Sequence, residues 1–338
     1  MRRGRNRWDS FSTTTCTTPS WSARSPTPAA AAPSSASACR PPAGSRRSTA
    51  SSGTASGRRP RSGCGATPYR DTTLPGYFFR AGDGDEPRPT LILTDGYDGT
   101  VEELWFANGA AALDRGYHVI AFDGPGQGSV LLDQGIVFRP DWENVVGPVL
   151  DHVLELPGVD PARIALMGWS FGGYTAPRAA TAEHRLAACV SDSGPYDLLG
   201  ALRARIPRPL TRNLPHGTVL TRPVLAAALR SVLRRPSAGW SLRRNLWVHG
   251  VDDPLELLGV LADYTLAGRE HLIRCPTFVC RTAGDDLTAA APTFAARLTC
   301  PSRYVEFGPA DGVTGHCEMT GRAVFHREVF DWLDEVLA

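Results

Sequence analysis

Lysine is absent from the 338-residue chain, and all 36 of its basic residues are arginine, which indicates a GC-rich coding sequence. No apolar run approaches the roughly 20 residues that a membrane-spanning helix requires. No apolar segment follows the arginines of "MRRGRNRW", which argues against a secretory signal. The eight cysteines form no C-x-x-C pair, so we predict buried or incidental thiols rather than a disulfide framework or a zinc site. A cytoplasmic protein is expected.

Residues 1–66 contain no leucine, isoleucine or valine, and they carry eleven arginines against one acidic residue, a formal charge of +10. Residues 67–338 carry 25 arginines against 33 acidic residues, a formal charge of −8. Because the first segment has little apolar surface to bury, we predict that it is disordered. Three interpretations remain open: a basic tail that binds an anionic partner, an organelle transit peptide, and an out-of-frame or functionless segment.

From residue 67, apolar and aromatic residues are interrupted by turn-forming residues, and this pattern predicts a β-hairpin. Strands that alternate with helices are predicted to follow it. This alternation predicts an α/β fold with a mostly parallel sheet and helices on both faces. The stretch 197–270 is too long for one crossover and contains apolar helical patterns, so we assign it as an inserted helical cap. Residues 67–196 and 271–338 then form the core.

The segment "ALMGWSFGGYTA" contains a G-x-S-x-G motif centred on Ser170. An apolar strand precedes this serine and a glycine-rich helix start follows it. That context predicts a sharp turn that strains Ser170 and exposes its hydroxyl as a nucleophile. The alternative is a small residue in an ordinary strand-to-helix turn.

A serine nucleophile needs a base and an orienting carboxylate. His316 lies in the loop "DGVTGHCEM", between the last strand and the last helix, where a base would project over the edge of the sheet. Asp285 and Asp286 follow the penultimate strand. We favour Asp285 as the acid, with Asp286 as a helix N-cap. The other histidines open a strand or have the character of surface or helix residues: His118, His152, His184, His216, His249, His271 and His326.

The backbone N–H groups of Tyr97 and Phe171 are the candidate oxyanion donors, since one follows the first central strand and the other follows the nucleophile. The loop "DGPGQGS" (123–129) lacks the full dinucleotide-binding pattern and is interpreted as a structural turn beside the site. Glu102 and Glu103 are interpreted as acids of a first helical turn, with a substrate-facing role as the alternative.

The segments "LPGYFFR", "TDGYDGTVEELWF", "AFDGPGQG", "GWSFGGYTAPRAA", "YTLAG" and "GHCE" together resemble a group of α/β-hydrolases. This group includes 2,6-dihydroxypseudooxynicotine hydrolase, fermentation–respiration-switch esterase-like proteins and fungal hydrolases that shorten polyketide pigment precursors. The resemblance implies that Ser170, Asp285 and His316 form a catalytic triad. It also implies an N-terminal helical domain where residues 1–66 stand, so either the reading frame is wrong there or part of the lid is lost.

The resemblance further implies hydrolysis of an ester or of a carbon–carbon bond next to a ketone, through an acyl-enzyme and without a metal or organic cofactor. We expect a small, natural-product-like substrate, no nucleic-acid or membrane partner, and an assembly compatible with a homodimer. Two alternatives stay open. One is a lyase or cyclase on the same fold that uses His316 as a base, and the other is an inactive, truncated hydrolase that acts as a binding protein.

Overall fold

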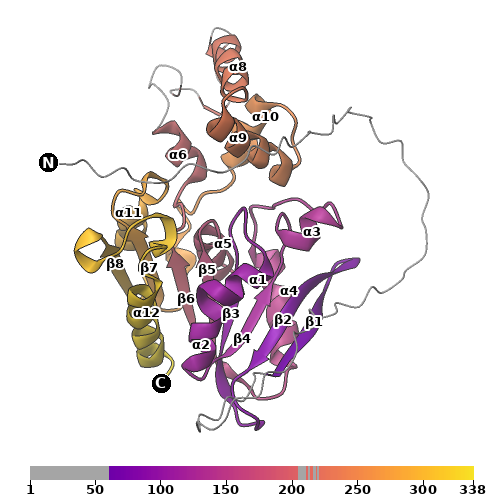
Figure 1. Cartoon of the computed structure of the whole chain (residues 1–338), viewed down its shortest axis with the longest axis vertical. Coiled ribbons are helices and arrows are strands. Elements are labelled where there is room, and N and C mark those ends of the chain that lie inside the picture. Colours follow the sequence, from indigo (N-terminus) through magenta and orange to yellow (C-terminus); the bar gives the residue numbers. More distant parts are fainter. Residues whose placement is uncertain (1–60, 205–210, 212–213, 216–217, 219–220) are drawn as a thin grey trace, which may run out of the picture. The chain divides into compact units, whose positions relative to one another are not determined.

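Eight β-strands form one sheet in the order β1-β2-β4-β3-β5-β6-β7-β8, with β1 and β2 at one edge and β8 at the other (Figure 1). The computed structural model describes residues 61–338 except 205–210, 212–213, 216–217 and 219–220. Strand β2 runs antiparallel to both of its neighbours, and the strands from β4 to β8 pair in parallel, as predicted. The strands span Arg61–Tyr69 (β1), Thr72–Arg80 (β2), Arg88–Thr94 (β3), His118–Phe122 (β4), Val159–Trp169 (β5), Ala188–Asp192 (β6), Thr277–Thr282 (β7) and Ser302–Phe307 (β8).

The hairpin expected at the start of the core is present as β1 and β2, but β1 begins at Arg61 and not after residue 66. Residues 61–66 pair in register with β2, so backbone hydrogen bonding rather than apolar content holds them in the sheet. The remainder of the segment predicted to be disordered, residues 1–60, lies outside the described residues.

Helices cover both faces of the sheet because the central strands are apolar on both sides. Ile92 of β3 belongs to the apolar cluster beneath α4 and α5, while its neighbours Leu91 and Leu93 belong to the cluster beneath α1, α2 and α12. Successive side chains of a strand point to opposite faces, so a continuous apolar run produces two cores. The core helices span Val101–Leu104 (α1), Ala110–Asp114 (α2), Gly128–Leu132 (α3), Glu143–Leu154 (α4), Gly172–Ala180 (α5), Ala291–Arg297 (α11) and Arg322–Val336 (α12).

The helical segment after β3 is divided, since a π-helical turn, Trp105–Gly109, separates α1 from α2. Short 3₁₀ turns cover Glu270–Leu272, Asp286–Thr288, Pro309–Asp311 and His316–Glu318. None of the helices in the described part of the chain has the length and apolar character to cross a bilayer.

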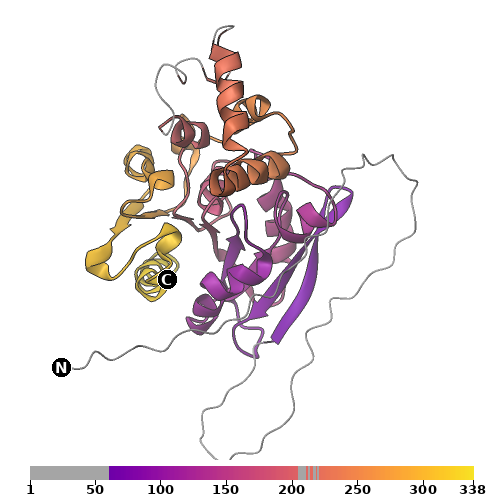
Figure 2. The same ribbon diagram turned by 45° about the horizontal axis from the view of Figure 1, so that its top comes forward.

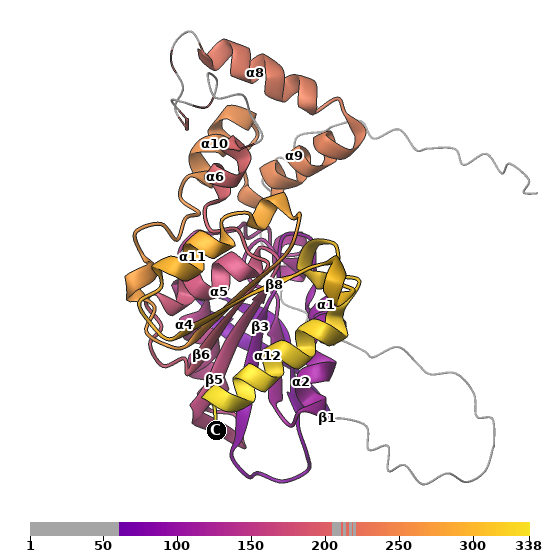
Figure 3. The same ribbon diagram turned by 90° about the vertical axis from the view of Figure 1, so that its left-hand side faces the viewer.

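Four helices described between β6 and β7 fall within the stretch assigned as a cap, and they gather beyond one end of the sheet (Figures 2 and 3). Contacts that tie them to the core include the hydrogen bond from the N–H of Phe138 to the carbonyl of Val248 at 2.8 Å and the ion pair of Arg244 with Asp98 at 2.9 Å. The cap helices span Leu198–Arg203 (α6), Thr221–Val232 (α8), Pro236–His249 (α9) and Pro254–Leu261 (α10).

Candidate active site

Ser170 occupies a tight turn between β5 and α5, and its φ of 60° confirms the predicted strain. A side chain at Gly168 would collide with the carbonyl of Gly172, and one at Gly172 would collide with the carbonyl of Thr94. Both glycines are therefore required by the close approach of backbone segments. The N–H of Ser170 donates to the carbonyl of Asp192, the last residue of β6, at 3.0 Å.

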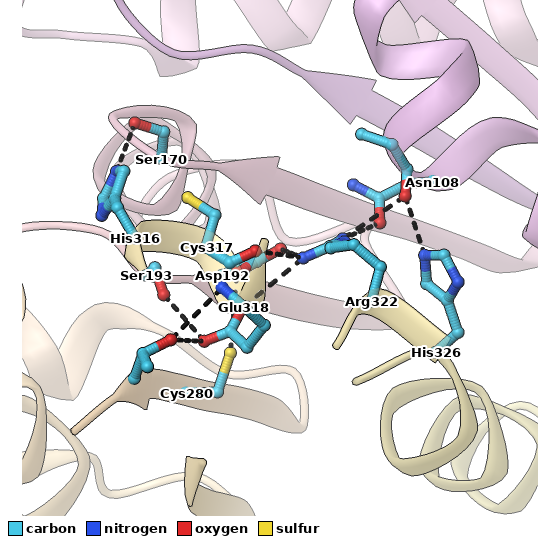
Figure 4. Close-up of polar contacts among 12 residues, drawn as sticks. Asn108, Ser170, Asp192, Ser193, Cys280, His316, Cys317, Glu318, Arg322 and His326 are labelled. Atoms are coloured by element: carbon cyan, nitrogen blue, oxygen red, sulfur yellow. Dashed lines mark hydrogen bonds and ion pairs between the residues drawn. The ribbon is translucent and has the colours of Figure 1, made fainter. Parts of the chain in front are cut away.

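A chain of two hydrogen bonds connects Ser170, His316 and Asp285. Ser170 Oγ lies 2.8 Å from His316 Nε2, and His316 Nδ1 lies 2.7 Å from Asp285 Oδ2 (the first contact is drawn in Figure 4). An ionised carboxylate can only accept, so Nδ1 carries the proton and Nε2 is left to accept from the serine hydroxyl. The structure thus brings together the three residues that the sequence singled out.

The aspartate doublet after β7 is resolved by geometry. Asp285 faces His316 and also accepts hydrogen bonds from the N–H of Leu287 at 3.0 Å and the hydroxyl of Thr288 at 3.1 Å, while Asp286 is exposed. The N-cap role expected of Asp286 therefore belongs to Asp285. Burial alone would raise the pKa of Asp285, but the hydrogen bond and charge of His316, with the two further donors, lower it overall.

The two candidate oxyanion residues lie side by side. The rings of Tyr97 and Phe171 stack with centroids 4.3 Å apart and an interplanar angle of 20°. A Cβ at Gly96 would lie 2.8 Å from the Cβ of Ser170 and 3.1 Å from the backbone nitrogen of Phe171. The loop after β3 therefore needs a glycine in order to lie against the serine turn, beside the N–H of Phe171.

Buried polar side chains hold this loop. The N–H of Gly96 donates to Asp95 at 2.6 Å, and the side-chain amide of Gln127 donates to the carbonyl of Asp95. Burial, reinforced by the charges of Glu103, Asp123 and Asp98 and opposed by the Gly96 hydrogen bond, raises the pKa of Asp95 to about 8. The segment 123–129 is thus a structural support beside the site, as interpreted from the sequence.

A cavity of ≈ 250 Å³ opens over the hydrogen-bonded serine and is lined by Tyr97, Trp169, His316 and Met319, among others. Glu103 also lines this cavity, whereas Glu102 accepts a hydrogen bond from the hydroxyl of Tyr77 at 3.2 Å. A second cavity of ≈ 530 Å³, between α9 and the core, shares Asp98 and Gly99 with the first.

The cap contributes a histidine that sequence analysis classed with surface or helix residues. His249, at the end of α9, is 5% exposed; its Nε2 lies 2.6 Å from the hydroxyl of Tyr97 and its Nδ1 lies 3.1 Å from the hydroxyl of Tyr264. Burial lowers its pKa to about 4. A histidine before glycine at a helix end carries no sequence signal for such a contact.

A second group that sequence reasoning missed lies close to Ser170 and His316. Asp192, Cys280 and Glu318 are buried together and are close enough to surround a metal ion, but the guanidinium of Arg322 already pairs with both carboxyl groups (Figure 4). A cation there would compete with that arginine, so these residues fit a metal poorly. The sequence feature that could have indicated this group is Glu318, the acidic residue two positions after His316.

Comparison with known proteins extends these observations. The sequence profile of the "Alpha/beta hydrolase family" matches residues 95–325. The hydrolase acrC of Aspergillus aculeatus is 36% identical over 272 residues, covering 75% of this chain and 62% of acrC. The 20-hydroxy-prefusarin hydrolase FUS2 of Gibberella moniliformis is 34% identical over 290 residues, covering 80% of this chain and 68% of FUS2. This chain therefore spans just under two thirds of acrC.

Among solved structures, 2,6-dihydroxy-pseudo-oxynicotine hydrolase superposes with a TM-score of 0.62 at 24% identity, over 82% of this chain and 69% of that one. At this identity the likeness shows the fold alone, and it confirms the expected α/β-hydrolase architecture. Profile, relatives and topology agree, so the chain belongs to the alpha/beta hydrolase family.

Proposed function

We propose that the chain is a serine hydrolase in which Ser170 is the nucleophile, His316 the general base and Asp285 the orienting acid. The observation that carries this proposal is the continuous hydrogen-bonded chain from Asp285 through His316 to the strained, cavity-lining Ser170. These are the contacts that acyl transfer by a serine requires.

The reaction follows from these contacts. Ser170 Oγ attacks the substrate carbonyl carbon while His316 Nε2 takes its proton, and the resulting oxyanion accepts hydrogen bonds from the N–H groups of Tyr97 and Phe171. Collapse of this intermediate expels the leaving group, which receives the proton from His316. Water, deprotonated by His316, then attacks the acyl-enzyme and releases the acid and free Ser170. Asp285 keeps the imidazole in one tautomer throughout.

The substrate that we propose is a small, natural-product-like ester or ketone. In the ester the leaving group departs as an alcohol, and in the ketone it departs as a carbanion or enolate that His316 protonates. The cavity of ≈ 250 Å³ over Ser170 matches a small acyl group, and its lining by Tyr97 and Trp169 favours an apolar one. FUS2, whose name gives 20-hydroxy-prefusarin as its substrate, supports the natural-product class. The steps need no metal or organic cofactor.

The test is covalent labelling with a fluorophosphonate, which requires an activated serine and no knowledge of the natural substrate. We expect one label per chain, mapped by mass spectrometry to the peptide containing Ser170. Ser170→Ala should abolish labelling and lower ester hydrolysis by at least about 10⁴-fold. Ser302→Ala, at an exposed serine at the start of β8, is the matched control and should label like the wild type.

The alternatives make different predictions in the same experiments. A lyase or cyclase that uses His316 as a base would retain turnover in Ser170→Ala and lose it in His316→Ala. A binding protein without hydrolase activity would fold, as judged by circular dichroism, and yet remain unlabelled. Either result would overturn the proposal.

A further inference from the structure

A cluster of two carboxyl groups and one guanidinium lies near Ser170 and His316 (Figure 4). Asp192 and Glu318 are both 0% exposed. Arg322 of α12 donates to Asp192 at 2.9 Å and lies 3.5 Å from Glu318 Oε2. The other oxygen of Glu318 accepts hydrogen bonds from the hydroxyls of Ser193 at 3.0 Å and Thr282 at 3.1 Å. We define Asp192, Glu318 and Arg322 as the carboxyl cluster.

The carboxyl cluster forms hydrogen bonds with the three segments that carry Ser170, His316 and Asp285. The carbonyl of Asp192 accepts the N–H of Ser170 at 3.0 Å. Arg322 donates to the carbonyl of Cys317, the residue after His316, at 3.0 Å. Thr282, three residues before the triad acid, accepts the N–H of Glu318 at 3.2 Å. A change in the cluster therefore reaches the nucleophile, the base and the acid together.

The turn that carries His316 is strained and needs such support. Cys317 and Glu318 have φ values of 56° and 53°, a region that residues other than glycine rarely adopt. Ser193, which follows Asp192, has a φ of 53° as well. Non-glycine residues persist in this conformation only where the surroundings hold them. Here the surroundings are the hydrogen bonds of Glu318 and Arg322.

The charge count of the cluster requires one proton. Two ionised carboxylates beside one guanidinium would leave a net negative charge in a buried site, which is strongly unfavourable. Burial, and next the charge of Asp192, raise the pKa of Glu318 to about 9, against the opposing effect of Arg322 and Ser193. A proton held between the two carboxyl groups at neutral pH makes the cluster neutral.

The other groups that face the cluster do not supply this neutralisation. Cys280 of β7 lies with its sulfur 3.8 Å from Asp192, and burial raises the pKa of both Cys280 and Cys317 well above their usual range, so these thiols stay uncharged. The side-chain oxygen of Asn108 accepts from Arg322. His326 of α12 is directed to the carbonyl of Ala107, and burial lowers its pKa.

We propose that the carboxyl cluster is a positioning device that holds one proton between Asp192 and Glu318, and that Ser170 and His316 stay aligned only while that proton is retained. The inference rests on the proposed function for its kinetic consequence, but the proton itself is a property of the fold. Glu318 acts through His316 and the cluster acts through the backbone of Ser170, so these are positioning residues.

The decisive variant is Glu318→Gln, because glutamine has the shape and the hydrogen-bonding groups of the protonated acid. In the wild type we expect kcat for a p-nitrophenyl ester, and the rate of fluorophosphonate labelling, to fall as the pH rises above about 9, with KM unchanged. Glu318→Gln should keep its neutral-pH kcat and lose this alkaline decline up to pH 10. Glu318→Ala should lose most of its kcat at every pH, because it removes the carboxyl oxygen that accepts from Ser193 and Thr282 and supports the turn.

Three results would overturn the inference. The first is that Glu318→Gln retains the alkaline decline of the wild type, and the second is that it loses activity, or fails to fold, to the same extent as Glu318→Ala. The third is one equivalent of bound metal in the wild type that Glu318→Gln lacks. Infrared spectroscopy reports the proton without activity: at pH 7 the C=O stretch of a protonated carboxylic acid should appear in the difference spectrum of the wild type minus Glu318→Gln, in which the band of protonated Asp95 cancels. A wild type that shows this band but is never labelled would refute the proposed function alone.

Discussion

His249 ties the cap to the core, and its burial makes the stability of the protein depend on pH. The imidazole lies between the hydroxyls of Tyr97 in the core and Tyr264, and it is 5% exposed. Burial lowers its pKa from the ordinary value of 6.5 to about 4. The folded protein therefore resists protonation of His249 at pH values where the unfolded chain accepts the proton.

The sign and size of the effect follow from this difference. Between pH 6.5 and pH 4 the unfolded state binds more protons at this position, so the free energy of unfolding falls as the pH falls. Each pKa unit corresponds to about 1.4 kcal/mol, and lowering the pH from 7 to 4.5 spans most of the window. We expect His249 to contribute about 2 kcal/mol of the stability lost over that interval.

The measurement is urea denaturation at pH 7 and pH 4.5 for the wild type and for His249→Gln, which keeps polar atoms near both tyrosines and does not titrate. The loss of stability should be about 2 kcal/mol smaller in the variant. His271→Gln, at an exposed histidine, is the control and should keep the full wild-type loss. Equal losses in the wild type and His249→Gln would refute the reasoning, because all other titrating groups are shared.

Three further predictions test the site and the core. Gly96→Ala should lower kcat for ester hydrolysis by about 10²-fold or more, because its Cβ would lie 2.8 Å from the Cβ of Ser170. Gly259→Ala in α10, whose Cβ would meet nothing within 4 Å, should leave kcat unchanged. Asp285→Asn should lower kcat by about 10⁴-fold, while Asp286→Asn should keep a kcat near that of the wild type. A larger loss in Asp286→Asn would contradict the proposal that Asp285 is the acid that orients His316. Leu166→Ala, at a fully buried position of β5, should lower the free energy of unfolding by about 2–5 kcal/mol in urea denaturation.

The sheet and the strained turn were predictable because their causes are local. The run Ile164–Met167 followed by G-x-S-x-G contains both the apolar strand and the glycines that the turn needs. The meeting of Ser170, Asp285 and His316 was also predictable. Each of them follows a strand, and the carboxyl ends of parallel strands lie at one edge of a sheet. The start of β1 at Arg61 was not predictable, since residues 61–66 contain no leucine, isoleucine or valine and lie in the sheet by backbone pairing with β2.

The amino-acid sequence by itself determined the strand and helix pattern, the glycines at 168 and 172, and the residue types that a serine hydrolase needs. These depend on periodicity, steric demand and chemical type, which are properties of short segments. Only the tertiary structure decided that Asp285 rather than Asp286 faces His316, that His249 reaches Tyr97, and that Glu318 is buried beside Asp192. These contacts join residues far apart in the chain, and their charge states depend on a burial that no single segment encodes.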